Sequence, residues 1–106
     1  ADAGKLGIGV DSNQNHLHPG SVLTSMMKRV DNATFAAFDD LKNDAWTGGV
    51  QVLGLAEEGV GWAFDDNNKS LITDDMKAKV DAATQDITSG KTKVHDYMSD
   101  STCPVS

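Results

Sequence analysis

Two short strand-like runs that each end in a charged side chain constrain this chain more than any other feature. The first, residues 6–10, is an apolar run that ends at Asp11. The second, residues 22–27, is rich in β-forming residues and ends at Lys28. Ligands bind just beyond the carboxyl ends of the strands in an open α/β sheet. The pattern therefore predicts a polar clamp of Asp11 and Lys28 for a small neutral molecule rich in hydroxyl groups.

The segments that follow predict a helix and a β-hairpin. Asp31 is a suitable N-cap for a helix that runs to about residue 43. Its apolar stripe of Phe35, Phe38 and Leu41 is typical of a helix packed on a sheet, and base stacking by these aromatics is the less favoured alternative. Residues 50–55 and 60–64 flank a turn at residues 57–59, which predicts two paired strands.

The last third of the chain predicts a capped amphipathic helix and an extended tail. Thr73 is the expected N-cap, and apolar residues recur at positions 76, 80, 83 and 87. Gly90 is expected to end this helix in the left-handed conformation. Residues 92–106 are predicted to form a short strand followed by extended chain.

Composition excludes several classes of partner. The chain has 106 residues and a formal net charge of −7, which argues against nucleic acid and against an anionic membrane surface as partners.

Two motif-like runs are also rejected as binding sites. The SGKT run at 89–92 lacks the glycine that a phosphate-binding loop needs. The run that starts at Asp65 lacks the glycine and the glutamate of a calcium loop, so residues 65–70 are interpreted as a turn-rich connector. His16 and His18 lack a third ligand at zinc spacing, so we expect no metal. Neither a nucleophile motif nor a facing pair of carboxylates indicates catalysis.

Four blocks carry a resemblance to a known family. They are GVDSNQ (9–14), VLTSMMKRVD (22–31), GVQVLGLAEEGVGWA (49–63) and the helix end SGKTKV (89–94). In this order they resemble the C-terminal portion of the basic membrane protein (BMP) family of ABC-transporter substrate-binding proteins, which includes purine-nucleoside receptor lipoproteins. The similarity runs from about residue 6 to residue 105.

The resemblance implies a fold and a function. We expect residues 1–106 to be one C-terminal fragment, without an internal domain boundary, of a two-lobed type I periplasmic binding protein. Its fold would be three-layer α/β/α with a mainly parallel sheet and a β-hairpin. The whole protein would capture a purine nucleoside between its lobes and deliver it to an ABC permease, without enzymatic chemistry or a cofactor. The expected location is the periplasm or cell envelope, with any lipid anchor on the absent N-terminal portion.

Two alternatives remain open beside this function. One is a different ligand in the same architecture, such as a sugar, an autoinducer or another small solute. The other is a sensor or adhesin that uses the fold without transport. The fragment is also expected to associate with itself or with the missing N-terminal portion, because its apolar surface would be left uncovered.

The resemblance also assigns roles to particular side chains. Asp11 would accept hydrogen bonds from the 2′ and 3′ hydroxyls of a ribose, and Lys28 would reach the ligand and keep Asp11 ionised. Taken without the family, Asp11 is a turn residue and Lys28 a surface lysine. Gln14 and Ser25 are expected to organise the backbone or to support the ligand contacts indirectly.

Two further side chains carry expectations. Trp62 is expected to be buried beneath the sheet. Cys103, the single cysteine of the chain, is expected to pair with a cysteine of the missing portion.

Overall fold

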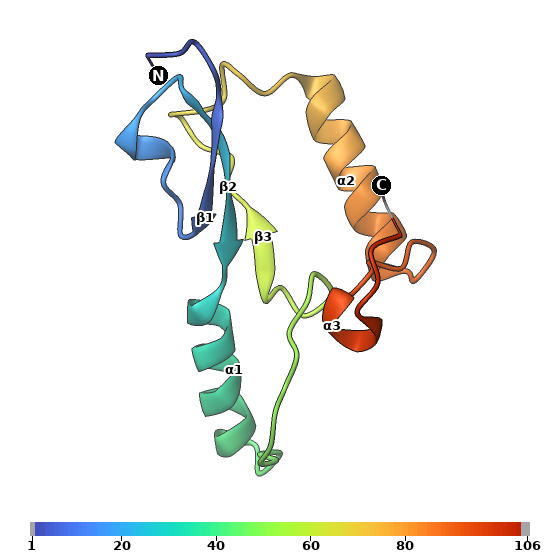
Figure 1. The fold of residues 1–106 in the computed structure, drawn as a ribbon. Coiled ribbons are helices and arrows are strands. Elements are labelled where there is room, and N and C mark those ends of the chain that lie inside the picture. The colour runs from blue at the N-terminus through green and yellow to red at the C-terminus, as the bar shows by residue number, and fades with distance from the viewer. Residues whose placement is uncertain (1, 105–106) are drawn as a thin grey trace.

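A mixed three-stranded sheet lies at the centre of the molecule (Figure 1). The computed structural model describes residues 2–104. Strands β1 (Gly7–Asp11) and β2 (Val22–Lys28) pair in parallel, and β3 (Val60–Trp62) adds to β2 in the antiparallel direction. The 3₁₀ turn η1 (Asn15–Leu17) lies in the connection from β1 to β2. The α/β fold and both strands that end at the predicted clamp are confirmed, although one of the two strand pairs is antiparallel.

Helix α2 (Asp74–Thr88) has the predicted caps, whereas the tail differs from its prediction. The Thr73 side chain accepts a hydrogen bond from the backbone N–H of Met76 at 3.2 Å, and Gly90 has a φ of 77°. The tail was expected to include a strand, but its described part contains the short helix α3 (Tyr97–Asp100), which starts where the Asp96 side chain accepts from the backbone of Met98. Residues 105–106 of that predicted tail lie outside the described residues.

Helix α1 (Val30–Lys42) does not use Asp31 as its N-cap, so that prediction is wrong. The helix begins at Val30, with Arg29 at the N-cap position, and Asp31 lies in its first turn. There its carboxylate accepts hydrogen bonds from the Arg29 guanidinium, with a shortest N–O distance of 2.8 Å. The carboxylate pairs with this neighbouring cation instead of capping the helix.

The pair of Arg29 and Asp31 gives a pH-dependent prediction. The hydrogen bond from Arg29 lowers the pKa of Asp31 from its ordinary value of 3.8 to about 2. Because the pKa is lowered in the folded state, this carboxylate stabilises the fold fully above about pH 4 and loses that contribution as the pH falls toward 2. We expect Arg29→Ala to raise the pKa of Asp31 toward 3.8, as measured by NMR titration of the carboxyl carbon. A midpoint that stays near 2 in the variant would contradict this assignment of the cause.

The predicted hairpin of residues 50–55 with 60–64 is wrong, although its turn exists. The backbone N–H of Gly59 donates to the carbonyl of Gly54 at 2.8 Å, so the chain does reverse direction. Residues 50–55 form no strand, and Val50 and Val52 are 96% and 87% exposed. The second arm of the expected hairpin, as β3, pairs with β2 instead. The long central strand is a partner that local sequence patterns do not reveal.

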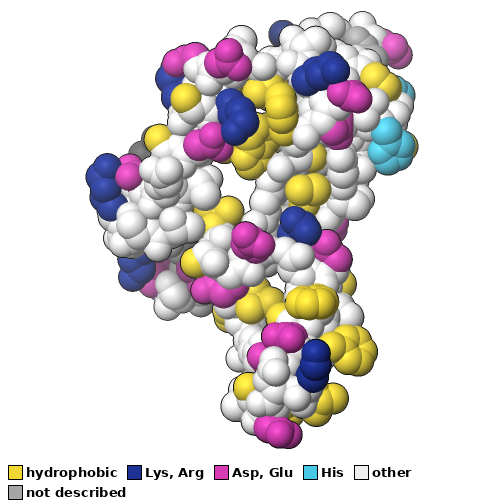
Figure 2. Space-filling view, turned by 180° about the vertical axis from the view of Figure 1, so that it is seen from behind, with side chains coloured by type: hydrophobic (Ala, Val, Ile, Leu, Met, Phe, Trp, Pro, Cys, Tyr) yellow, Lys and Arg dark blue, Asp and Glu magenta, His cyan; other side chains and the backbone are white. Residues whose placement is uncertain are grey.

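The described residues bury almost no apolar core. Ala63 is the one buried apolar side chain among them, while Phe35, Phe38 and Leu41 are 73%, 69% and 61% exposed. The radius of gyration is 16.8 Å, against about 13 Å for a compact domain of this size. Helix α1 projects away from the sheet, with hydrophobic side chains along this arm (Figures 1 and 2). The prediction that the α1 stripe packs on a sheet is therefore wrong for the described residues, because the one sheet that they form does not cover this stripe.

Gly9 marks the tightest contact between β1 and β2. A Cβ atom at this position would lie 2.5 Å from the Ser25 hydroxyl oxygen and 2.9 Å from Cβ of Gln14. We expect Gly9→Ala to lower the free energy of unfolding by about 1–3 kcal/mol, the usual cost of overpacking, as measured by urea denaturation. Gly7→Ala is the matched control on the same strand, because nothing lies within 4 Å of its added Cβ. Equal stability of the two variants would contradict this prediction.

Candidate functional site

The structure brings Asp11 and Lys28 together at the end of the parallel strand pair. Asp11 is paired in register with Met27, so the carboxylate emerges beside the residue that precedes Lys28. The Lys28 ammonium nitrogen lies 3.1 Å from a carboxylate oxygen of Asp11. Their side chains are 62% and 66% exposed, so both keep hydrogen-bonding capacity toward solvent or a ligand. An exposed ion pair contributes about 0–1 kcal/mol to stability, so the fold does not depend on this pair.

The backbone of Asp11 has an unusual conformation. Its φ is 73°, in the left-handed region that non-glycine residues rarely occupy and that aspartate tolerates better than most. This conformation turns the chain out of β1 directly into the loop of residues 12–15. Gln14 joins this turn to both strands. Its side-chain amide donates to the Val10 carbonyl in β1 at 2.9 Å, and its backbone N–H donates to the Ser25 hydroxyl in β2 at 3.0 Å. The predicted backbone-organising roles of Gln14 and Ser25 match these contacts.

A buried polar network behind this loop was missed by the sequence analysis. Ser25 and Asn15 are fully buried, and the Ser25 hydroxyl donates to the Asn15 side-chain oxygen at 2.8 Å. The side-chain amides of Asn13 and Asn15 both donate to one carboxylate oxygen of Asp65, at 2.7 and 3.1 Å. The other oxygen accepts from the backbone N–H of Asn67 at 2.7 Å. Asp65 therefore joins the loop after β1 to the turn after β3.

Asn68 anchors the other side of the same network and is fully buried. Its side-chain oxygen accepts from the backbone N–H of Asp65 at 2.8 Å, and its amide nitrogen donates to the carbonyls of Leu23 and Ala63, both at 2.9 Å. The interpretation of residues 65–70 as a turn-rich connector is confirmed, and these turns also hold β2 and β3 together. The six consecutive polar residues of this stretch indicate a solvated turn, and no local sequence pattern shows that Asn68 is buried.

The charge state of Asp65 follows from these contacts. The hydrogen bond from Asn13, followed in importance by the backbone N–H of Asn67, lowers the pKa of the Asp65 carboxyl. Asp65 is therefore ionised at neutral pH, and both of its oxygens act as acceptors. An ionised carboxylate that accepts several N–H groups holds them more firmly than a neutral acceptor would.

Three hollows on the surface of the described residues lie away from the ion pair. The first, about 650 Å³, is lined by apolar side chains of α1, mainly Phe38 and Leu41, together with Trp46. The second, about 220 Å³, lies beside the start of β1 and includes His18. The third, about 420 Å³, lies at residues 93–100. None of these three hollows includes Asp11 or Lys28.

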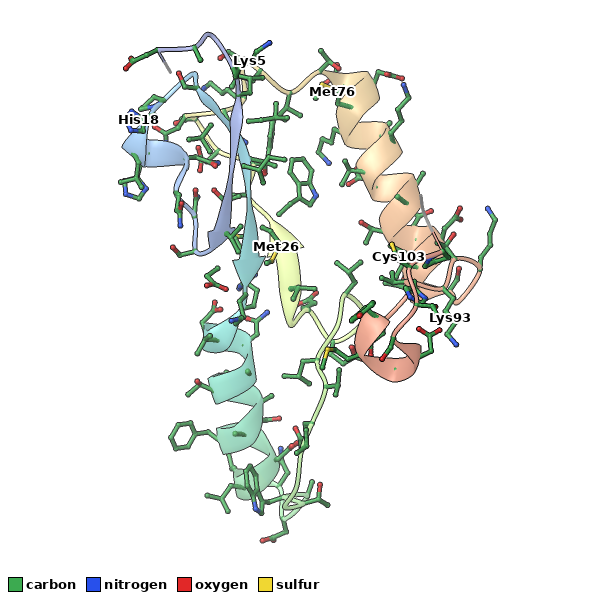
Figure 3. All side chains as sticks on the ribbon, in the orientation of Figure 1. Lys5, His18, Met26, Met76, Lys93 and Cys103 are labelled. Atoms are coloured by element: carbon green, nitrogen blue, oxygen red, sulfur yellow. The ribbon has the colours of Figure 1, made fainter. Side chains whose placement is uncertain are left out.

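The remaining candidates of the sequence analysis show no shared site. Among residues 2–104, no three His, Cys, Asp or Glu side chains gather in a cluster that would hold a metal ion. His18 lies on the outer side of the β1–β2 connection (Figure 3). Cys103 lies near the C-terminal end of α2, far from His18. Cys103 is exposed, and its predicted pairing stays a prediction. Trp62 is half-buried instead of buried, with its ring 5.9 Å from that of Phe64.

Comparison with known proteins assigns the chain to a family. The model of the Bmp family, described as ABC transporter substrate-binding protein PnrA-like, matches residues 2–97. This chain belongs to the Bmp family. The predicted family is thereby confirmed, and both Asp11 and Lys28 lie within the matched residues. Within residues 2–104 of this Bmp protein, no helix combines the length and the apolar character that crossing a bilayer requires.

Relatives of this Bmp protein come from archaea and bacteria. An uncharacterized lipoprotein of Pyrococcus furiosus is 41% identical over 61 residues, which are 57% of this chain and 15% of that protein. Basic membrane protein D of Borreliella burgdorferi is 37% identical over 65 residues, which are 59% of this chain and 19% of that protein. The chain therefore spans less than a fifth of the length of these relatives.

A solved structure supports the fold of the Bmp chain. The crystal structure of an ABC transporter system solute-binding protein from Aeropyrum pernix K1 superposes with a TM-score of 0.67 at 25% sequence identity. The match covers 85% of this chain and 32% of that structure. The small α/β unit described above thus corresponds to about a third of a solute-binding protein.

Proposed function

We propose that these residues belong to a longer, two-lobed binding protein of an ABC importer that captures a purine nucleoside. The observation that carries the proposal is the ion pair of Asp11 and Lys28 beyond the carboxyl ends of two parallel strands. Ligands of open α/β sheets bind at this edge. Membership of the Bmp family supports the class of protein, and the chemistry of the two side chains supports the class of ligand.

A carboxylate beside an ammonium group suits a neutral ligand that carries vicinal hydroxyls. The Asp11 carboxylate has two acceptor oxygens, and the cis 2′ and 3′ hydroxyls of a ribose present two donors at a matching separation. Lys28 then donates to a ribose oxygen or to an acceptor on the base. The pair is close to neutral overall, so an uncharged nucleoside does not introduce an uncompensated charge into the closed cleft.

The mechanism of the proposed protein is binding and release without bond chemistry. Asp11 and Lys28 supply one wall of the cleft, and a second lobe closes over the ligand by a hinge movement. Closure follows from binding because the closed form makes contacts with the nucleoside that the open form lacks. The loaded protein then docks on a membrane permease. The lipoprotein names of the archaeal relatives support a place at the outer face of the cell membrane.

Native mass spectrometry of the freshly purified full-length protein tests the ligand class. We expect a co-purified mass equal to that of a purine nucleoside, and isothermal titration of the stripped protein should show tighter binding of guanosine, inosine or adenosine than of ribose. A preference for ribose, or the absence of binding to all four compounds, would overturn the nucleoside assignment.

A further inference from the structure

The loop that follows Asp11 is bound by the carboxylate of Asp65, a residue that belongs to no binding motif of the sequence. Asp65 lies 54 residues further along the chain, in the turn after β3. One of its oxygens accepts both side-chain amides of the loop, from Asn13 at 2.7 Å and from Asn15 at 3.1 Å. Neither amide contacts Asp11 itself. The contact can therefore act on the Asp11 carboxylate only indirectly, through the position of the loop.

The strained backbone of Asp11 needs such support. A non-glycine residue at a φ of 73° costs free energy and persists only where its surroundings fix it. On the strand side, the surroundings are the two hydrogen bonds of Gln14. On the far side, the Asn15 side chain accepts from the buried Ser25 hydroxyl at 2.8 Å and donates to Asp65. The loop is thus fixed to β2 and to the turn of residues 65–68 at the same time.

We propose that Asp65 is a positioning residue. It sets the direction of the Asp11 carboxylate through its hydrogen bonds with Asn13 and Asn15 and through the loop backbone that joins these two residues to Asp11. This inference rests on the proposed function, because it assigns Asp11 the ligand contact. Asp65 touches no ligand. It holds the loop in the conformation in which a carboxylate oxygen of Asp11 lies 3.1 Å from the Lys28 ammonium nitrogen.

The chemistry of the network requires a carboxylate at position 65. Each oxygen of Asp65 already faces N–H donors, since one accepts from Asn13 and Asn15 and the other from the backbone of Asn67 at 2.7 Å. An asparagine has a single acceptor oxygen, so its NH₂ group would face a donor on one side or the other. Asp65→Asn therefore breaks part of the network while keeping the size of the side chain.

Asp66→Asn is the matched control. It removes the same charge one residue further on, from a side chain that is 91% exposed and pairs with Lys69 at 2.7 Å. Groups that orient a ligating side chain typically change affinity by about 10- to 100-fold when they are removed from metal sites, and we expect a loss in this range for Asp65→Asn. Isothermal titration of the full-length protein with guanosine, inosine and adenosine measures it. Asp66→Asn should bind within about twofold of the unchanged protein, as is usual for surface substitutions.

A double-mutant cycle separates positioning from a general structural role. If Asp65 acts through Asp11, the loss of nucleoside affinity caused by Asp65→Asn shrinks to about twofold or less in the Asp11→Asn background. The reason is that the side chain at position 11 has then already lost its carboxylate. A merely structural defect would lower affinity by the same factor in both backgrounds. Equal factors, or unchanged affinity in Asp65→Asn, would overturn the inference.

Hydrogen exchange tests the role of Asp65 in the loop independently of whether the protein binds a nucleoside. The backbone N–H groups of Gln14 and Asn15, which donate to Ser25 and Asn13, should exchange faster in Asp65→Asn than in Asp66→Asn. If the unchanged protein binds no nucleoside, the proposed function fails, and this measurement still decides whether Asp65 holds the loop. Equal exchange in the two variants would overturn the inference whatever the ligand.

Discussion

Replacing Asp11 by alanine is expected to abolish nucleoside capture and to leave the fold intact. Charge-assisted hydrogen bonds contribute roughly 1.5–3 kcal/mol each, and the proposed contact with the ribose makes two of them. Their loss corresponds to a decrease in affinity of about 100-fold or more. Isothermal titration of the full-length protein with guanosine, inosine and adenosine measures the change.

The fold is expected to survive this change because the lost ion pair with Lys28 is largely exposed. Asp11→Asn is the control for the backbone, since asparagine also tolerates the left-handed conformation and keeps one acceptor oxygen. We expect it to bind more tightly than Asp11→Ala but more weakly than the unchanged protein. Unchanged affinity in Asp11→Ala would show that the ligand contacts lie elsewhere.

Asn68→Ala is expected to have the largest effect on stability. The fully buried Asn68 side chain bonds the backbone N–H of Asp65 and the carbonyls of Leu23 and Ala63. The Ala63 carbonyl also accepts from the Thr24 hydroxyl at 2.8 Å, so the substitution mainly affects the backbone N–H of Asp65 and the carbonyl of Leu23. A buried polar group left unsatisfied costs about 1–3 kcal/mol, and the free energy of unfolding should fall by about 3 kcal/mol.

Urea denaturation of the full-length protein, followed by circular dichroism, measures this loss. Ser70→Ala is the control, because it truncates an exposed polar side chain in the same turn and should change stability by less than about 0.5 kcal/mol. A water molecule that occupies the space of the missing amide would reduce the effect but would not remove it. Equal stability of the two variants would refute the role assigned to Asn68.

The parts of the fold that local chemistry determines were predictable. The strand ends at Asp11 and Lys28 follow from runs of β-forming residues, and the caps Thr73 and Gly90 follow from their own backbone and side-chain preferences. The closeness of the two charged side chains was also predictable, because parallel strands place their carboxyl ends at one edge.

The parts that depend on distant partners were not predictable in the same way. The network joins Asn15 to Asp65 across 50 residues and Leu23 to Asn68 across 45. Apart from Ser25 in β2, the side chains of the network are polar residues in turn-like stretches, and such residue types by themselves indicate exposure. The strand at 60–62 pairs with β2 and not with residues 50–55 for a related reason, because the choice between two partners depends on tertiary contacts. The contacts of Asp65 could not be predicted for this reason.

Strand β1 has a neighbour on one side only among the described residues, since the sheet order is β1-β2-β3. Its opposite side therefore presents a row of main-chain N–H and C=O groups, flanked by Ile8 and Val10, which are 63% and 51% exposed. Such a row is a template on which another extended peptide can add as a new strand. Preparations of this segment alone are therefore expected to form β-rich aggregates, which thioflavin fluorescence would detect, and a design that ends the sheet here needs a charged or proline residue on this strand.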